Sequence, residues 1–281
     1  MKNVITRAIT GLLYVALIVG AIMGGSWWFW GLTTLFAVLA VNEFNRITNK
    51  NFVSNTTSLL DMIGAALLTT ATGPQFSGGF EWALSHPTVA VCALGYFLYM
   101  LLRFIIQLYV QDGNPLSHLA HSVMGQVYIA FPMAMLNCLY NSAGKYIVLA
   151  MFILIWLSDT GAFCVGSLLG KHKLFERISP KKSWEGFFGG LAFCLIAPAV
   201  FFYGFGSDFP GMSLWSMLGL GAVVCVCATW GDLIESLVKR SLNVKDSGNL
   251  LPGHGGILDR IDSLLLVTPG VTFYLLCLLH F

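Results

Sequence analysis

Apolar stretches about as long as a lipid bilayer is thick follow one another along almost the whole of this sequence. A helix that spans a membrane needs about 20 mostly apolar residues. The segments that approach or reach this length are residues 7–24, 27–42, 59–73, 87–109, 117–140, 146–170, 184–204, 213–231 and 264–280. Because no soluble domain or repeat separates them, the pattern predicts an all-α polytopic integral membrane protein with about nine transmembrane helices.

The composition also favours a lipid environment. Of the 281 residues, 57% are hydrophobic and only 10% are charged, and the mean hydropathy is +0.77. A soluble domain carries roughly 25% charged residues, so this chain has too little polar surface to face water on all sides. The net charge of +2 argues against a protein that wraps nucleic acid, and we expect no nucleic-acid partner.

The positions of Lys and Arg predict the orientation, because both are enriched in the cytoplasmic loops of membrane proteins. With nine spans and a cytoplasmic N-terminus, 13 of the 15 basic residues lie on the inner side. Arg103 falls near the inner end of the fourth span, where its side chain can snorkel, and Lys145 falls outside. We therefore predict a cytoplasmic N-terminus, a first region of about five spans (1–145), and a second region (146–281) whose functional site faces the cytoplasm.

A polar helix face follows the eighth predicted span. At 100° per residue, one side of a helix carries polar groups and the other carries aliphatic ones; the polar set is Asp232, Glu235, Ser236, Lys239 and Asn243. A solvated face with charge pairs four residues apart is the alternative interpretation. We favour a functional site, because Asp232 follows directly on a long apolar run and ionisable groups at membrane depth are costly.

A second acidic cluster, Asp259 and Asp262, comes just before the ninth predicted span. If this segment is helical too, two helices offer small carboxylate clusters, and facing carboxylates hold Mg²⁺ together with water and phosphate oxygens. The segment between the clusters contains Lys245, Asp246 and His254 and is rich in glycine. Its backbone can therefore approach a phosphate closely.

The other long inner loop is also rich in polar groups. Its candidate substrate ligands are Asp159, Ser179, Lys181, Lys182, Ser183 and Glu185. Two cations and two hydroxyls stand at what the sequence predicts to be a helix start, an arrangement suited to phosphate. Membrane anchoring is the alternative interpretation, and it accounts for the lysines but not for Asp159, which interrupts an apolar span.

These two regions resemble the phosphatidate cytidylyltransferases, also called CDP-diacylglycerol synthases. The first block consists of Asp159-Thr-Gly-Ala-Phe163 and the later Ile178-Ser-Pro-Lys-Lys-Ser-Trp-Glu-Gly186, and the second covers residues 236–262. The resemblance implies an enzyme that joins CTP to phosphatidic acid and releases pyrophosphate, with Mg²⁺ as two divalent ions. It also implies a homodimer in the cytoplasmic membrane of a bacterium, with residues 146–281 as the catalytic region.

The resemblance further implies roles for individual residues. Asp232 and Asp259 would ligate the metal, and Lys239, Arg240 and His254 would be catalytic with them. The predicted substrate-binding residues are Asp159, Ser179, Lys181, Lys182, Ser183, Glu185, Ser236, Lys245, Asp246 and Asp262.

Two other classes of protein remain open at this point. A CTP-dependent kinase of a lipid alcohol has similar membrane motifs, but it would release CDP in place of pyrophosphate. A transporter with intramembrane acids would show broken helices in paired repeats, and the sequence contains no internal repeat.

Overall fold

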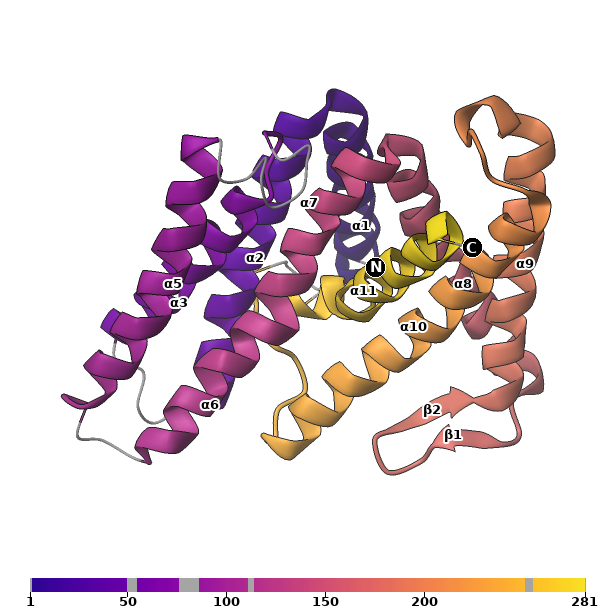
Figure 1. The fold of residues 1–281 in the computed structure, drawn as a ribbon. Coiled ribbons are helices and arrows are strands. Elements are labelled where there is room, and N and C mark those ends of the chain that lie inside the picture. Colours follow the sequence, from indigo (N-terminus) through magenta and orange to yellow (C-terminus); the bar gives the residue numbers. More distant parts are fainter. Residues whose placement is uncertain (1, 50–54, 76–85, 111–113, 251–254, 281) are drawn as a thin grey trace. The chain divides into compact units, whose positions relative to one another are not determined.

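Helices form nearly all of the chain, as expected of segments that must satisfy their backbone hydrogen bonds within lipid (Figure 1). The structure, a computed structural model, describes residues 2–49, 55–75, 86–110, 114–250 and 255–280. The α-helices are α1 (Lys2–Gly24), α2 (Ser26–Thr48), α3 (Asn55–Ala71), α5 (Pro87–Gln107), α6 (Pro115–Gly125), α7 (Phe131–Ala143), α8 (Lys145–Leu169), α9 (Trp184–Phe205), α10 (Leu214–Ser241) and α11 (Leu258–His280). A π-helical turn, η1 (Gln126–Ala130), joins α6 to α7, and a 3-10 turn, η2 (Gly206–Asp208), follows α9.

Each predicted span coincides with a helical segment of the structure, and the predicted span 117–140 lies in the continuous run of α6, η1 and α7. Within the described residues, six helical segments are long and apolar enough to cross a membrane: Pro87–Gln107, Pro115–Ala143, Lys145–Leu169, Trp184–Asp208, Leu214–Ser241 and Leu258–Leu278. These helices confirm an all-α membrane protein. The count of nine stays a prediction, because α1, α2 and α3 lie outside this set.

A two-stranded antiparallel hairpin between α8 and α9 was not predicted. It consists of β1 (Lys173–Phe175) and β2 (Ser179–Ser183), with Phe175 opposite Ser179 (Figure 1). The sequence pattern predicts a helix start across this run, but α9 begins only at Trp184. Pro180 has no backbone N–H to donate, and a hairpin of two edge strands tolerates this. Ser183 caps α9 by accepting a hydrogen bond from the Gly186 amide at 3.2 Å.

The chain divides into two compact units, Met1–Ser142 with Val244–Arg260, and Ala143–Asn243 with Ile261–Phe281. In the first unit, α2 packs against α1 and α3, and α3 packs against α5. The first unit is not one continuous stretch, because the segment Val244–Arg260 groups with the N-terminal helices. The predicted domains 1–145 and 146–281 stay a prediction.

A buried polar network lies inside the first unit around Asp61 of α3, which is 2% exposed. Its carboxylate accepts hydrogen bonds from Tyr99 Oη at 2.9 Å and Asn45 Nδ2 at 3.0 Å, and also from the Ser122 hydroxyl. Arg103 Nε lies 3.3 Å from Asp61 Oδ1. Charges at this depth are stable only when they are paired and hydrogen-bonded, and here they are.

The expectation that Arg103 snorkels to the membrane interface is therefore wrong. Its side chain is buried and donates to Ser122 Oγ and Gln107 Oε1, each at 2.8 Å, in addition to its ion pair with Asp61. A charged hydrogen-bonding partner inside the unit satisfies the guanidinium where it lies.

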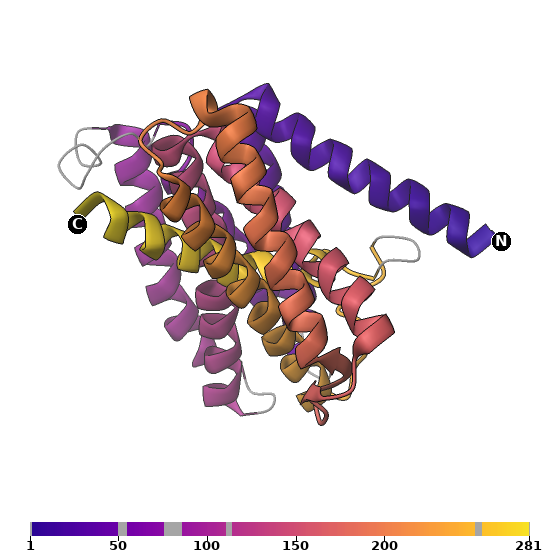
Figure 2. The same cartoon turned by 90° about the vertical axis from the view of Figure 1, so that its right-hand side faces the viewer.

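In the second unit, α8, α9 and α10 lie side by side (Figure 2). Glycine makes the contact between α8 and α9 close: a Cβ at Gly190 would lie 2.8 Å from the carbonyl oxygen of Ser158, and one at Gly186 would lie 2.9 Å from that of Ala162. Small residues that let backbones approach are typical of helix pairs in membranes, where van der Waals packing drives association. This contact places the start of α9 and the hairpin next to the polar residues of α8.

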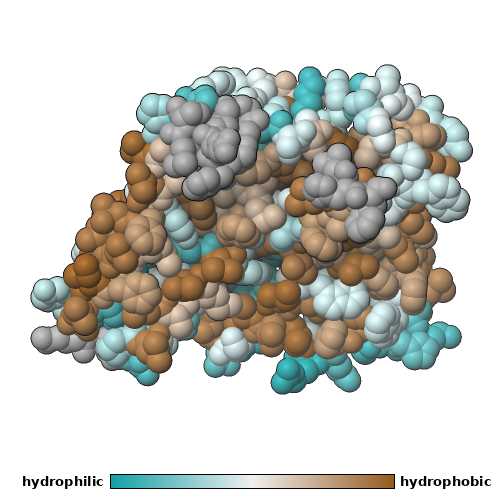
Figure 3. All heavy atoms as spheres, viewed as in Figure 1, coloured by the Kyte–Doolittle hydropathy of each residue, from teal (hydrophilic) through white to brown (hydrophobic). Residues whose placement is uncertain are grey.

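The outer surfaces are apolar, as a lipid-facing protein requires. On α5, the side chains of Val91, Leu94, Phe97, Leu98 and Phe104 are all more than half exposed. Figure 3 shows hydrophobic residues spread over much of the visible face, including the region of α5 at its left. Exposed apolar area of this extent is unusual for a soluble monomer and fits a bilayer.

Candidate functional site

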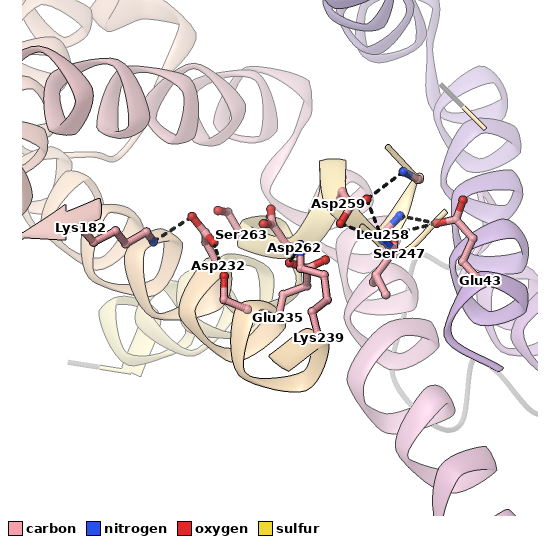
Figure 4. A network of polar contacts seen from close by, with 12 residues as sticks. Glu43, Lys182, Asp232, Glu235, Lys239, Ser247, Leu258, Asp259, Asp262 and Ser263 are labelled. Atoms are coloured by element: carbon pink, nitrogen blue, oxygen red, sulfur yellow. Dashed lines mark hydrogen bonds and ion pairs between the residues drawn. The ribbon is translucent and has the colours of Figure 1, made fainter. Parts of the chain in front are cut away.

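Three carboxylates of the second unit meet where α10 and α11 pack together (Figure 4). Asp232 and Glu235 lie on α10 and Asp262 on α11, and one oxygen of each lies within 4.8 Å of the others. Gly231 permits the close approach of the helices, because a Cβ there would lie 3.0 Å from the Asp262 carbonyl oxygen and from Ser263 Cα. The i,i+3 spacing of Asp232 and Glu235 turns both side chains to this contact.

Cationic and hydroxyl groups surround these acids. Lys182 Nζ, from strand β2, lies 2.8 Å from Asp232 Oδ2, and Ser236 Oγ donates to Asp232 Oδ1 at 3.2 Å. Lys239 pairs with Glu235 one helical turn away. Lys182 also donates to the Thr229 carbonyl oxygen at 3.2 Å, so that two groups of α10 hold its ammonium group. The predicted polar face of α10 is confirmed except at Asn243, which lies beyond the end of the helix at Ser241. The acids of this face have cationic neighbours.

A cavity of about 490 Å³ opens beside Asp232. The cavity brings Asp232, which lies four residues before the second block, together with residues of the first block. The polar residues that line it include Asp159, Lys181, Lys182, Ser183 and Asp232. The rest of its wall includes the apolar side chains of Phe163, Leu174 and Phe187. A volume of this size suits a small-molecule ligand, and the mixed lining suits one that is charged at one end and apolar at the other.

Other predicted site residues lie elsewhere in the second unit. Glu185 accepts hydrogen bonds from the amides of Lys171 and His172 at 3.1 and 3.2 Å and contacts His172 Nδ1 at 2.6 Å, so it ties the entry of the hairpin to the start of α9. Ser179 begins strand β2, and Arg240 is exposed in the last turn of α10.

The remaining predicted residues belong to the first unit or are not described. Asp259 accepts hydrogen bonds from the amides of Gly256 at 2.8 Å and Ser247 at 3.0 Å. Lys245 and Asp246 are exposed. His254 lies outside the described residues. The part of Asp259 in a metal site with Asp232 stays a prediction.

The structure adds two acids to the predicted set. Glu235, which the helical pattern placed on the polar face but not among the ligands, is 1% exposed and belongs to the carboxylate group. Glu43 of α2 is the second acid, and its carboxylate accepts hydrogen bonds from the amides of Ile257 and Leu258 at the start of α11. Its position directly after an apolar predicted span is the signal that could have identified it.

The donor set of Asp232, Glu235 and Asp262 fits a hard divalent cation. Carboxylate oxygens are the ligands that Mg²⁺ prefers, and two or three of them leave coordination positions for water and phosphate oxygens. Three acids this close repel one another unless positive charge lies near, and the described residues supply Lys182 and Lys239. The arrangement can therefore hold a cation beside a cavity large enough for a small phosphate-bearing ligand.

Comparison with known proteins gives a consistent result along nearly the whole chain. A model of the cytidylyltransferase family matches residues 5–278. A phosphatidate cytidylyltransferase of Staphylococcus aureus (strain COL) is 34% identical over 273 residues, which is 96% of this chain and 98% of the relative. One of Staphylococcus haemolyticus is 35% identical over 245 residues, covering 86% and 89% of the two chains. One of Staphylococcus saprophyticus is 46% identical over 136 residues, 48% of this chain and 51% of the relative.

Proposed function

The chain belongs to the cytidylyltransferase family, and from this premise we propose that it transfers the cytidylyl group of CTP to phosphatidate. The products are CDP-diacylglycerol and pyrophosphate, and the reaction serves phospholipid biosynthesis. The observation that carries the proposal within the structure is the cavity in which Asp159, Lys181, Lys182, Ser183 and Asp232 meet. Its charged part suits phosphate groups, and its apolar wall suits the glycerol and proximal acyl carbons of a lipid.

The chemistry requires one displacement at phosphorus. An oxygen of the phosphatidate phosphate forms a bond to the α-phosphorus of CTP, and the bond from that phosphorus to the oxygen bridging to the β-phosphate breaks. Pyrophosphate leaves with the bonding electrons. A phosphate monoester carries nearly two negative charges at pH 7, so the nucleophile needs no general base and no covalent enzyme intermediate. The protein must position two polyanions and offset their charge.

The residues around the cavity are suited to that task. Lys182 is held by Asp232 and the Thr229 carbonyl, so its ammonium group is oriented before substrate binds. Lys181 adds a second cation from the same strand. Ser183 accepts from the Gly186 amide, which leaves its O–H available to donate to a phosphate oxygen. Fixed donors of this kind stabilise developing charge more than mobile ones, because they need not reorganise.

Mg²⁺ is the cofactor that we propose, with Asp232, Glu235 and Asp262 as the residues of the second unit that would hold it. When bound, the ion would offset negative charge on phosphate oxygens and on the leaving pyrophosphate. Asp259 as a further ligand, and a total of two divalent ions, are expectations from the family resemblance. Lys239 would limit the repulsion among the acids through its pair with Glu235.

We also propose the finer features of the membrane arrangement. The bias of the basic residues supports nine spans with the N-terminus and the active site on the cytoplasmic side. The bacterial origin of the relatives supports the cytoplasmic membrane as the location. A homodimer is an expectation from the family resemblance.

The proposed function is tested with purified protein in detergent or nanodiscs, labelled CTP, phosphatidate and Mg²⁺. We expect a labelled CDP-lipid and an equal amount of pyrophosphate, with both depending on phosphatidate. Diacylglycerol should not replace phosphatidate, because it lacks the attacking phosphate oxygens. Release of CDP with phosphorylation of a lipid alcohol would refute the proposal in favour of a kinase.

A further inference from the structure

Glu43 is a carboxylate buried in the interior of the first unit, with 7% of its surface exposed. A buried carboxylate is costly unless strong donors satisfy it. Its donors come from a distant segment of the same unit: the Ile257 amide donates to Oε1 at 3.0 Å, and the Leu258 amide donates to Oε2 at 2.9 Å. Ser247 Oγ adds a third hydrogen bond to Oε2 at 3.2 Å (Figure 4).

The backbone of that segment is shaped to fit around Glu43. A Cβ at Gly248 would lie 2.7 Å from Glu43 Oε1, and a Cβ at Gly256 would collide with Oε2. The sequence pattern predicts that the glycines between the two acidic clusters let the backbone approach a phosphate. At these two positions the group that the backbone approaches is the Glu43 carboxylate.

Glu43 and Asp259 accept hydrogen bonds from neighbouring donors of the same segment. Ser247 donates its hydroxyl to Glu43 and its amide to Asp259, and the Gly256 amide donates to Asp259 while the next two amides donate to Glu43. Leu258 is the first residue of α11, so Glu43 also caps the positive end of the helix that carries Asp259 and Asp262.

We propose that Glu43 is a positioning residue for the reaction, one that fixes Ser247 and the described residues 256–259 at the start of α11. The inference rests on the proposed function, because Asp259 is one of the predicted catalytic residues. Glu43 does not touch substrate in this role, since three protein donors already occupy its carboxylate. Its negative charge holds the amides of Ile257 and Leu258 and thereby fixes the backbone that carries Asp259.

Hydrogen exchange tests the proposal without substrate or metal. Glu43→Gln keeps the side-chain volume but turns one acceptor oxygen into an NH₂ group that cannot accept a backbone hydrogen bond. The amides of Ile257 and Leu258 should exchange on the order of tenfold faster in this variant, because charged hydrogen bonds to Glu43 protect them in the wild type. Glu43→Asp keeps the charge and both acceptors, so it should lie between wild type and Glu43→Gln. Unchanged exchange in Glu43→Gln would overturn the proposal.

The kinetic readout separates positioning from general stability. In Glu43→Gln, the Mg²⁺ concentration for half-maximal activity should rise severalfold and kcat should fall about tenfold or more. Asp61→Asn is the matched control: it alters another buried carboxylate of the same unit, whose partners are Asn45, Tyr99, Ser122 and Arg103. It should lower Tm without changing the Mg²⁺ dependence or the exchange of Ile257. Equal shifts in both variants would contradict a specific role for Glu43.

A milder variant keeps the test decisive if Glu43→Gln does not fold. Ser247→Ala removes only the hydroxyl that donates to Glu43, and it should shift exchange and Mg²⁺ dependence in the same direction by a smaller factor. No shift at all in folded Ser247→Ala and Glu43→Asp would refute the proposal. A wild-type protein that makes no CDP-lipid would instead refute the proposed function, and the exchange result would still decide on Glu43.

Discussion

Asp232 connects the main groups of the second unit's site, because it lines the cavity, pairs with Lys182 and belongs to the carboxylate group. Asp232→Asn keeps the volume nearly constant but removes one negative charge, so Lys182 loses its ionic partner and the acidic group loses a ligand. We expect kcat/KM to fall on the order of a hundredfold to a thousandfold, the usual loss for one electrostatic contact at a reacting centre. Steady-state formation of CDP-lipid at saturating Mg²⁺ measures it.

The control for this prediction is Asp208→Asn, in the η2 turn at the far end of α9 from Ser183. It should retain normal activity and a normal Tm. If Asp259 serves the same metal centre, the double variant Asp232→Asn with Asp259→Asn should be scarcely worse than either single one, since groups that act as a unit are not additive. Near-normal activity of folded Asp232→Asn would show that the proposed site is wrong.

Sequence periodicity could predict side-chain contacts within one helix but not between distant segments. The pairs of Ser236 with Asp232 and of Lys239 with Glu235 follow from the i,i+4 spacing on α10. The pair of Lys182 with Asp232 joins residues far apart in sequence, and only the fold brings them together. Glu235 and Asp262 were visible as acids, but their meeting depends on Gly231 and on the angle of two helices, which no local pattern encodes.

At the scale of the helices, the contact between α8 and α9 depends on residues without side chains. Gly190→Ala would place a Cβ 2.8 Å from the Ser158 carbonyl oxygen, so the helices must separate or the backbone must shift. We expect a loss of about 1–3 kcal/mol, the usual effect of overpacking, visible as a lower Tm in detergent. Activity should fall with it, because the same contact places the lysines of β2 beside Asp232.

Gly204 provides the matched control on the same helix. A Cβ at this position has no atom within 4 Å, so Gly204→Ala should leave Tm unchanged or raise it slightly, because alanine is the better helix former. Equal destabilisation by both substitutions would mean that the glycine contact is not what holds α8 and α9 together.

The helices themselves were predictable because twenty apolar residues in lipid have almost no other way to satisfy their backbone. The hairpin was not, because β1 and β2 are only three and five residues long and their pairing gives no periodic signal. Ser183 was correctly placed near a helix start, since serine is a favoured N-cap.

At the scale of the whole molecule, the bias of the basic residues gives a topological prediction. In a background without the seven native cysteines, a cysteine at position 145 should react with an impermeant thiol reagent added outside intact cells. A cysteine at position 173 should react only after the membrane is permeabilised. The two positions are both lysines in the native chain, so each substitution removes the same charge. Reversed labelling would contradict the cytoplasmic N-terminus and the nine-span count.

The order of helices along the chain could be read from hydropathy, but their grouping could not. The segment Val244–Arg260 belongs with the first unit although it follows α10, and it does so through contacts with Glu43 about two hundred positions earlier. Contacts over that separation leave no periodic trace in the amino-acid pattern, so a single sequence does not report them.

The pairing of Asp61 with Arg103 constrains how this sequence can change over evolutionary time. Loss of either partner alone leaves the other as a charge without its ionic partner inside the first unit, and breaking a buried pair in this way costs about 3–5 kcal/mol. Loss of both at once, with apolar replacements of similar volume, costs far less. Related proteins that fold well should therefore keep both residues or have lost both. Changing one residue at a time would produce a poorly folded single mutant as an intermediate.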